Sequence, residues 1–382
     1  MSAVRPSAVI VHDWFQGFHG SERVVEAMRA DVFGGKADVL TFHAARELLP
    51  EQLADAIVKE SRLAALPGIR QRGHDPGRWR YLLPWMPFYY RLLDVSRYDV
   101  VVSSSHACAV AVRPRADAAH ICYCYTPMRY AWLPTLESGR VSGLKRTGLA
   151  ALTAPLRELD LAASRRPDSY VAISEAVRER IRRFYGRDAA VIHPPVETHR
   201  ISPSKPKDQD QFLWVHRLVG YKHPLVVAEA FRGLPWRLVM VGVGPLEGAL
   251  KADLPPNVEL RGWLDREELI ALYEESAGFL HVGEEDFGIT MVEALAAGTP
   301  VIGLDRGGAR DIVRRDVDGL LIDAPTVEKV RAGVREVAAR NFDPATLAEG
   351  AQRFSYERFA SQMRDHVASL RSRALTSASA WS

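Results

Sequence analysis

Short apolar runs of strand length alternate with helix-length periodic segments along this chain of 382 residues, and the pattern runs through twice. In the first half the runs fall at 8–11, 39–42, 98–103, 120–125, 169–173 and 190–193. In the second half they fall at 212–215, 237–241, 258–261, 278–282 and 300–304, with helical periods at 225–231, 266–275, 291–297 and 327–339. Continuous apolar strands separated by helices indicate parallel sheets that are covered on both faces. The sequence therefore predicts an α/β protein with two Rossmann-like parallel-sheet lobes, whose ligands lie at the carboxyl ends of the strands in a cleft between the lobes.

A polar stretch rich in Pro, Ser and charge separates the two halves and has no periodicity, as expected of a linker. We expect an N-terminal acceptor-binding lobe over 1–200, the linker at 201–211, a donor-binding lobe over 212–355 and a C-terminal helix over 356–375. The helix is predicted because Phe354, Phe359, Met363, Val367 and Leu370 recur near helical spacing. A chain of this length is too long for one ordinary domain.

Composition excludes several classes of protein. The net charge is only +3, with 50 basic and 47 acidic residues, which argues against a nucleic-acid-binding protein. Three cysteines, Cys108, Cys122 and Cys124, are an odd number and suggest a reducing compartment; four clustered metal ligands are missing around them. The N-terminal apolar run lacks the features of a signal peptide, and no apolar run is long enough to span a bilayer. We therefore expect a cytoplasmic protein with no bound metal.

An acidic segment follows one strand of the second half. Glu285 falls on the loop and Glu293 one turn into the next helix, so both carboxylates can face one ligand. The free N–H groups where this helix begins, near Thr290, favour an anion. The competing interpretation is a capping box, because Thr290 and Glu293 have that spacing.

Two cations follow the first strand of the second half. Arg217 and Lys222 suit a diphosphate, with Arg as a bidentate donor and Lys as a point charge. Lys occurs eight times among the 50 basic residues, which favours function over a solvated surface pair. Gly242 and Gly244 follow the next strand, but the third Gly of a dinucleotide fingerprint is missing. These glycines either let the backbone approach the donor or make a tight turn.

Three features of the first half carry alternative interpretations. Gly20 and Ser21 open a helix and can contact phosphate or sugar, or Ser21 can be a simple N-cap. His106 ends a strand, although a lone His is usually structural. Residues 77–93 mix Arg with large aromatics, which suits either an anionic membrane surface or an inter-lobe or core contact.

Taken together, these segments resemble the retaining glycosyltransferases of family 4, which have the two-lobed GT-B fold with a last helix that crosses back to the first lobe. The resemblance runs almost from end to end. It rests on HDW at 12–14, GSERV at 20–24, SSSH at 103–106, YCYTPMRYAW at 123–132, IS at 173–174, HRLVGYK at 216–222, GVGP at 242–245, EDFGIT at 285–290, EALAAGTP at 293–300 and GG at 307–308.

The resemblance implies a role for each matching residue. Arg217 and Lys222 would neutralise the donor diphosphate, Glu285 would contact the hydroxyls of the transferred sugar, and Glu293 the ribose. The catalytic candidates are therefore His106, Glu285, Arg217 and Lys222. The remaining donor-binding candidates are Gly20, Ser21, Gly242, Gly262, Trp263, Phe287, Gly288, Ile289, Thr290 and Glu293. Candidates on the acceptor side are Asp13, Tyr125, Arg129 and Tyr130.

Departures from the family pattern bear on the acceptor more than on the donor. His216 stands where a small residue is usual, Ser21 replaces a second Gly, and Tyr125 stands where His is expected. The match at 126–132 to mannosyltransferase-like members favours GDP-mannose, with UDP- or dTDP-sugars open. The acceptor would be a glycan, a lipid-linked glycan or a small-molecule hydroxyl, and a lipid-linked one would fit peripheral contact with the inner face of the membrane through 77–93.

The resemblance implies hexose transfer with retention, by attack on the leaving-group face and with no metal or other cofactor. Two alternatives share the expected fold. A sugar-nucleotide epimerase would interconvert donors without an acceptor, and a non-catalytic nucleotide-sugar-binding protein would do no chemistry. Nucleoside diphosphate release from candidate nucleotide-sugars distinguishes all three.

Overall fold

The computed structural model describes residues 7–66, 69, 78–132 and 144–379. The chain divides into two compact units, Met1–Pro195 with Phe359–Ser382 (unit 1) and Val196–Arg358 (unit 2). The boundary falls near residue 200, where the sequence predicts the end of the first lobe. Residues 208–211, predicted as part of the linker, instead begin strand β8 (Asp208–Val215). The side chains of 208–210 stay accessible to solvent, whereas Gln211 is buried and donates a hydrogen bond to Oγ of Ser276 at 3.2 Å.

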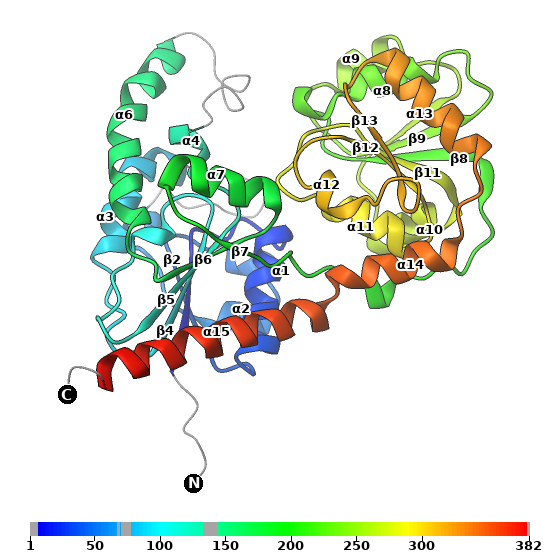
Figure 1. Ribbon diagram of the computed structural model, residues 1–382. Coiled ribbons are helices and arrows are strands. Elements are labelled where there is room, and N and C mark those ends of the chain that lie inside the picture. Colours follow the sequence, from blue (N-terminus) through cyan, green and yellow to red (C-terminus); the bar gives the residue numbers. More distant parts are fainter. Residues whose placement is uncertain (1–6, 67–68, 70–77, 133–143, 380–382) are drawn as a thin grey trace. The chain divides into compact units, whose positions relative to one another are not determined.

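Unit 1 is built on a parallel sheet, which in the described residues has the strand order β3-β2-β1-β4-β5-β6-β7 (Figure 1). The strands are β1 (Ala8–His12), β2 (Asp38–Thr41), β3 (Ile57–Lys59), β4 (Val100–Ser105), β5 (Ala119–Cys124), β6 (Ser169–Ala172) and β7 (Ala190–Val191). Every residue of β1, β4 and β5 is buried, as expected for strands covered on both faces.

Helices connect the strands of unit 1. They are α1 (Gly20–Ala27), the π-helical η1 (Met28–Val32), α2 (Glu51–Ala56), α3 (Met86–Arg91), α4 (Arg129–Trp132), α6 (Leu144–Ser164) and α7 (Glu175–Tyr185), with short 3-10 turns η2 (Arg46–Leu48), η3 (Arg62–Ala65), η4 (Trp79–Trp85) and η5 (Ala109–Ala111). The last helix of the chain, α15 (Tyr356–Ser379), begins in unit 2 and belongs to unit 1 from Phe359 onward.

Unit 2 repeats the plan with a second parallel sheet, ordered β10-β9-β8-β11-β12-β13 in the described residues. Its strands after β8 are β9 (Arg237–Val241), β10 (Val258–Arg261), β11 (Ser276–His281), β12 (Val301–Leu304) and β13 (Gly319–Ile322). Its helices are α8 (Pro224–Phe231), α9 (Glu247–Ala252), α10 (Arg266–Glu275), α11 (Ile289–Ala296), α12 (Ala309–Ile312), α13 (Val327–Ala339) and α14 (Pro344–Ala351), with 3-10 turns η6 (Thr198–Arg200), η7 (Gly220–Lys222) and η8 (Gln352–Phe354).

The strand order reverses at one point in each sheet. In unit 1, β1 lies between β2 and β4, with His12 beside Thr41 on one side and Ser104 on the other. In unit 2, β8 pairs with β9 on one side and β11 on the other. Loops that leave the carboxyl ends of strands at such a reversal diverge and leave room for a ligand. The loops after β1, β4, β8 and β11 carry most of the site residues predicted from the sequence.

Candidate active site

A buried lysine meets a partly exposed glutamate where the sheet of unit 2 reverses. Lys222 ends η7, in the loop after β8, and is 3% exposed. Its Nζ contacts Oε1 of Glu285, which stands in the loop after β11. Burial of an ammonium group is costly unless an anion lies beside it. The contact therefore joins two of the predicted catalytic residues and gives the buried cation its counter-ion.

Two histidines that the sequence reasoning did not place in the site lie against this pair. His281, the last residue of β11, is fully buried, with its Nε2 3.5 Å from Oε2 of Glu285. Its ring centroid is 4.4 Å from that of His216, and its Nδ1 is 3.4 Å from Oγ1 of Thr290. Burial, and then the charge of Lys222, holds the pKa of His281 well below its usual range. His281 is therefore neutral beside Glu285. Its position at the end of a strand, the signal used for His106, would have identified it.

The helix after Glu285 presents its N-terminus to the same loop. Gly288 precedes α11 with φ of +112°, a conformation that side chains disfavour. A Cβ at Gly288 would lie 2.3 Å from the end of Met291 and 3.5 Å from Oε2 of Glu285. The predicted N–H donors of residues 288–290 stand at this N-terminus, where an anion is favoured. The side chain of Phe287 points instead to the core, with its ring 5.5 Å from that of Phe354.

Arg217 and Gly242 lie on the neighbouring loops after β8 and β9. Arg217 is exposed, in contrast to Lys222. Gly242 has φ of +144°, and a Cβ there would lie 1.9 Å from the carbonyl oxygen of His216. This close approach of two backbone segments explains why residue 242 is Gly, and no bound dinucleotide is needed to account for it. Gly262 accepts a hydrogen bond from the N–H of Gly242, at 3.0 Å. Trp263 follows the edge strand β10, three strands from β11, and is 80% exposed.

Glu293 is already engaged within the protein. It is 7% exposed, and its carboxylate accepts hydrogen bonds from Arg266 at 2.6 Å and from the Tyr273 hydroxyl at 3.2 Å. The capping-box alternative is wrong, because α11 begins at Ile289 and Glu293 is the fifth residue of the helix. The predicted contact of Glu293 with a ribose stays a prediction, and a ribose would share this carboxylate with Arg266 and Tyr273.

In unit 1 the first loop is anchored by Asp13. Its fully buried carboxylate accepts hydrogen bonds from the N–H groups of His106, Ala107, Cys108 and Ala109, between 2.6 and 2.9 Å. Both oxygens are therefore occupied by the turn after β4. This gives Asp13 a structural task that the predicted acceptor role did not include, since it ties the loop after β1 to the loop after β4.

His106 stands on that turn and remains half-buried. Its Nδ1 is 3.4 Å from Oδ2 of Asp13, and its ring lies 4.5 Å from that of Trp14. Burial lowers the pKa of His106, while the Asp13 carboxylate opposes this shift and Arg129 adds to it. His106 thus has the exposure and the oriented ring that a sugar contact needs. Arg129 and Tyr130, at the start of α4, are both half-buried.

Tyr125 and Ser21 are brought together. The Tyr125 hydroxyl lies 2.9 Å from Oγ of Ser104 and donates to the carbonyl oxygen of Ser21 at 3.1 Å. Ser21 is not an N-cap, because α1 begins at Gly20 and its N-cap is His19, whose N–H donates to Glu22 at 3.2 Å. Ser21 donates its hydroxyl to the same carboxylate, at 3.0 Å. Burial raises the pKa of Glu22 to about 7.

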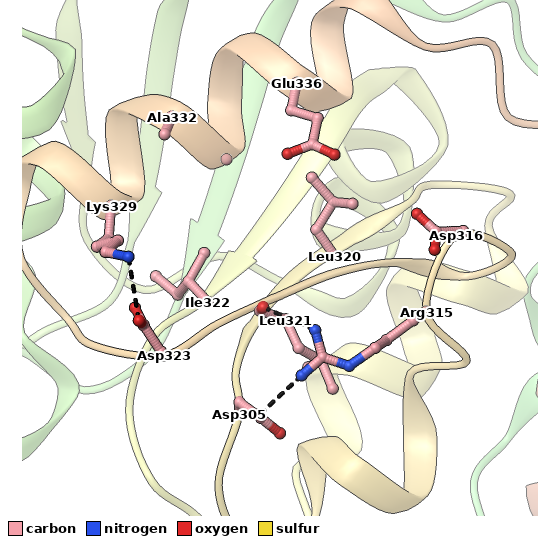
Figure 2. Close-up of a pocket in the computed structure, with 11 residues that line it drawn as sticks. Asp305, Arg315, Asp316, Leu320, Leu321, Ile322, Asp323, Lys329, Ala332 and Glu336 are labelled. Carbon is pink, nitrogen blue, oxygen red and sulfur yellow. Dashed lines mark hydrogen bonds and ion pairs between the residues drawn. The ribbon is translucent and has the colours of Figure 1, made fainter.

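A cavity of about 420 Å³ in unit 2 lies apart from the predicted donor residues. Figure 2 shows it between α13 and the ends of β12 and β13, with Arg315 paired to Asp305 and Lys329 to Asp323. These ion pairs, at 2.7 and 3.0 Å, leave no uncompensated charge on either basic residue. No predicted site residue lines the cavity, so it adds nothing to the donor site. Among the described residues, no group of three or more His, Cys, Asp or Glu could hold a metal ion.

The comparisons with known proteins agree with this arrangement. The family model described as Glycosyltransferase Family 4 matches residues 20–200, and Glycosyl transferases group 1 matches residues 195–354. A GDP-mannose-dependent alpha-mannosyltransferase of Corynebacterium glutamicum is 34% identical over 140 residues, which is 34% of each chain. A D-inositol 3-phosphate glycosyltransferase of Xylanimonas cellulosilytica is 27% identical over 52% of this chain and 56% of its own. The chain therefore spans about a third to about half of the length of these curated relatives.

Solved structures match over nearly the whole chain. Sucrose-phosphate synthase from Thermosynechococcus elongatus has a TM-score of 0.71 at 17% identity, covering 96% of this chain and 100% of its own. The Anabaena protein HepE, solved in complex with UDP, has a TM-score of 0.69 at 17% identity, covering 95% and 100%.

Two parallel-sheet units of this topology define a two-lobed α/β protein with the GT-B fold. Two glycosyltransferase family models together cover residues 20–354, and the chain is built of the two domains that family 4-like glycosyltransferases combine.

No helix among the described residues is long and apolar enough to cross a membrane.

Proposed function

We propose that the chain transfers a hexose from a nucleoside diphosphate sugar to a hydroxyl of a glycan, a lipid-linked glycan or a small molecule. The observation that carries the proposal is the contact between buried Lys222 and Glu285 at the reversal point of the unit 2 sheet, beside the N-terminus of α11. It supplies a cation, a carboxylate and backbone donors in one place. GDP-mannose is the proposed donor, supported by curated relatives of 34% and 40% identity that are named GDP-mannose-dependent alpha-mannosyltransferases.

In the proposed reaction, Lys222 has two successive partners. Before the donor binds, Glu285 neutralises the buried ammonium group. A bound diphosphate would take over that task, because its charge is greater and two charged oxygens can face the cation. Glu285, whose Oε2 lies 3.5 Å from Nε2 of neutral His281, would then be free to accept hydrogen bonds from the sugar hydroxyls. The exchange would couple diphosphate binding to sugar positioning.

The proposed chemistry proceeds with retention and without a metal. The bond between the sugar C1 and the phosphate oxygen breaks, and its electron pair leaves with the nucleoside diphosphate. Arg217, Lys222 and the α11 N-terminus stabilise the charge that develops there. The acceptor oxygen attacks C1 from the same face, and its proton passes to a donor phosphate oxygen. Glu285 positions the sugar and forms no covalent bond, so the two-carboxylate scheme of glycosidases does not apply.

Release of nucleoside diphosphate from a panel of GDP-, UDP- and dTDP-sugars, with and without candidate acceptors, tests this function. Release with formation of a glycosylated acceptor supports transfer. Interconversion of donors without an acceptor would indicate an epimerase, and binding without turnover would indicate a non-catalytic protein; either result would overturn the proposal.

Substitutions test the roles of the charged residues. We expect Arg217→Ala and Lys222→Ala each to lower turnover by at least about tenfold, a loss of about 1.4 kcal/mol of transition-state stabilisation. Lys251→Ala, which removes an exposed cation on α9, is the matched control. Glu285→Gln should also lower turnover, yet bind nucleoside diphosphate at least as tightly as the parent, since it removes the competing anion from Lys222. Near-normal turnover in the Arg217 or Lys222 variant would contradict the assignment.

A further inference from the structure

One helical face of unit 1 carries its apolar side chains outward. Tyr81, Trp85, Phe88 and Leu92 lie on η4, α3 and the residue after α3, and are 74%, 62%, 44% and 83% exposed. Trp85, Phe88 and Leu92 follow at the spacing of three and four residues that marks one side of an α-helix, and Tyr81 is exposed in the 3-10 turn before them. The opposite side, with Met86, Tyr90 and Leu93, is buried in the core. The segment therefore has a core face and a second apolar face, which we call the outer stripe (Tyr81, Trp85, Phe88 and Leu92).

The outer stripe belongs to a larger exposed apolar area. In the described part of unit 1, the other exposed large apolar side chains are Val58, Leu63 and Leu66, so all of them fall within residues 58–92. Backbone hydrogen bonds from Ile69 to Leu66 and from Arg78 to Ile69, both 3.0 Å, connect η3 to the start of the stripe. Scattered apolar side chains are ordinary on a protein surface, but their concentration in one segment indicates a contact surface.

Arginines without acidic partners lie next to the stripe. Arg91 is in the last turn of α3, Arg113 follows η5, and Arg166 follows α6; η5 contacts both helices. Burial lowers the pKa of Arg166, and the charges of Arg113 and Arg91 lower it further, so each of these two arginines lies close enough to Arg166 to repel it. Among the described residues, no carboxylate forms an ion pair with any of the three. An anion placed among these like charges would be attracted to all of them.

Two of these arginines also line a recess. A cavity of about 340 Å³ is lined by Arg113, Arg115, Arg166, His120 and Asp168, among others. Its acidic residue is Asp168, of which Oδ2 accepts a hydrogen bond from the N–H of His120 at 2.8 Å. His120 is 2% exposed, and its Nδ1 has no hydrogen-bond partner in the part of the chain that the structure describes. The recess therefore presents three arginines to an anion, against one carboxylate among its lining residues.

We propose that this face of unit 1 docks on an anionic phospholipid bilayer, with the outer stripe in the boundary between headgroups and acyl chains and Arg91, Arg113 and Arg166 on lipid phosphates. Tyr and Trp prefer that boundary because one part of each ring system is apolar and another forms hydrogen bonds. A second copy of the chain fits less well, because a twofold contact through the stripe would bring like arginine clusters together. The inference does not depend on the transfer reaction.

Sedimentation of the full chain with vesicles, in the absence of any nucleotide-sugar, tests the proposal. We expect binding to vesicles of phosphatidylcholine with phosphatidylglycerol, weakened by salt, and little binding to phosphatidylcholine alone. Arg91→Gln with Arg113→Gln should lower the partition constant by roughly tenfold or more, since each basic side chain near an anionic surface contributes about fivefold. Trp85→Ser with Phe88→Ser should also lower the partition constant, because the variant loses apolar contact with the acyl chains. Val317→Ser and Arg335→Gln, at exposed positions of unit 2, are the matched controls.

The results that would contradict membrane docking can be told apart from one another. Absence of binding by the parent chain would overturn the proposal, as would undiminished binding by both double variants, whose folding is checked by thermal unfolding. A parent dimer in solution that the stripe variant converts to a monomer would assign the face to a second copy instead. Because nucleoside diphosphate release is measured without vesicles, failure of membrane binding and failure of the proposed transfer are told apart.

Discussion

Buried carboxylates in this protein differ in how completely their charge is compensated. Asp13 accepts four backbone hydrogen bonds, and Glu293 is held by Arg266 and Tyr273. Asp160, on α6, receives hydrogen bonds from Trp132 and Tyr185, but both go to Oδ2, at 2.7 Å. Its Oδ1 is buried without a hydrogen-bond partner in the described residues. Burial therefore raises the pKa of Asp160 to about 7, against the pull of the two donors.

This asymmetry predicts a pH-dependent stability. The pKa of Asp160 is higher in the folded state than the ordinary value of 3.8, so the unfolded chain loses its proton first as pH rises. The free energy of unfolding should fall between about pH 4 and pH 7, at about 1.4 kcal/mol for each unit of pKa difference. Asp160→Asn keeps an acceptor for Trp132 and Tyr185 and removes this loss. We expect the variant to be a few kcal/mol more stable than the parent at about pH 8, and no more stable at about pH 4.

Urea unfolding across this pH range measures the difference. Glu158→Gln, at an exposed position of the same helix, is the control and should follow the parent. An unchanged pH dependence in Asp160→Asn would show that the buried carboxyl does not titrate in this window.

At the scale of elements, the loop after β12 supports the loop that carries Glu285. Gly308 donates its N–H to the carbonyl oxygen of Glu285 at 2.9 Å. Gly307 has φ of +59°, and a Cβ there would lie 2.1 Å from the same oxygen. Backbone atoms cannot rotate away as a side chain can. Gly307→Ala should therefore displace the Glu285 loop, lowering turnover by more than its effect on stability accounts for.

Gly186 provides the matched control for this substitution. It ends α7 with φ of +64° and has no atom within 4 Å of a Cβ built on it. Gly186→Ala should cost about 1–2 kcal/mol from the left-handed backbone alone, with turnover unchanged. Unfolding curves and nucleoside diphosphate release on both variants compare the two effects. Equal losses of turnover in the two variants would show that Gly307 has no specific role in supporting the Glu285 loop.

The sequence pattern predicts the positions of the strands better than it predicts the partners of individual side chains. Apolar runs identify the buried strands, and the rule for carboxyl ends then places Lys222 and Glu285 near one another. The short strand β3, two of whose three residues are exposed, and the strand β13 are not among the predicted apolar runs. Partners set by packing escape it altogether, because Asp13 bonds residues 93 to 96 positions away and Glu293 bonds residues 27 and 20 positions away. A periodicity within one helix or strand gives no information on contacts between residues so far apart in the sequence.

At the scale of the whole molecule, the C-terminal helix connects the end of the chain to its beginning. The apolar residues that recur at helical spacing near the C-terminus pack in both units. Phe354 packs on Phe287 in unit 2, with ring centroids 5.5 Å apart. Phe359 packs on Tyr123 in unit 1, with ring centroids 5.9 Å apart. Further along α15, Met363 is fully buried, and His366 lies 2.9 Å from the hydroxyl of Ser169 on β6. Unit 1 is therefore completed by residues that follow unit 2 in the sequence.

Met363→Ala should consequently destabilise unit 1 and spare unit 2. Loss of a fully buried Met side chain costs about 2–5 kcal/mol, because the neighbours do not close the cavity. Hydrogen exchange resolves the effect by element: amide protection should fall in β5 and β6 and persist in β8 and β11. Ser361→Ala, on the exposed side of the same helix, should leave both sheets protected. If protection fell equally in the two sheets, the units would unfold as one, and α15 would stabilise the whole chain and not unit 1 alone.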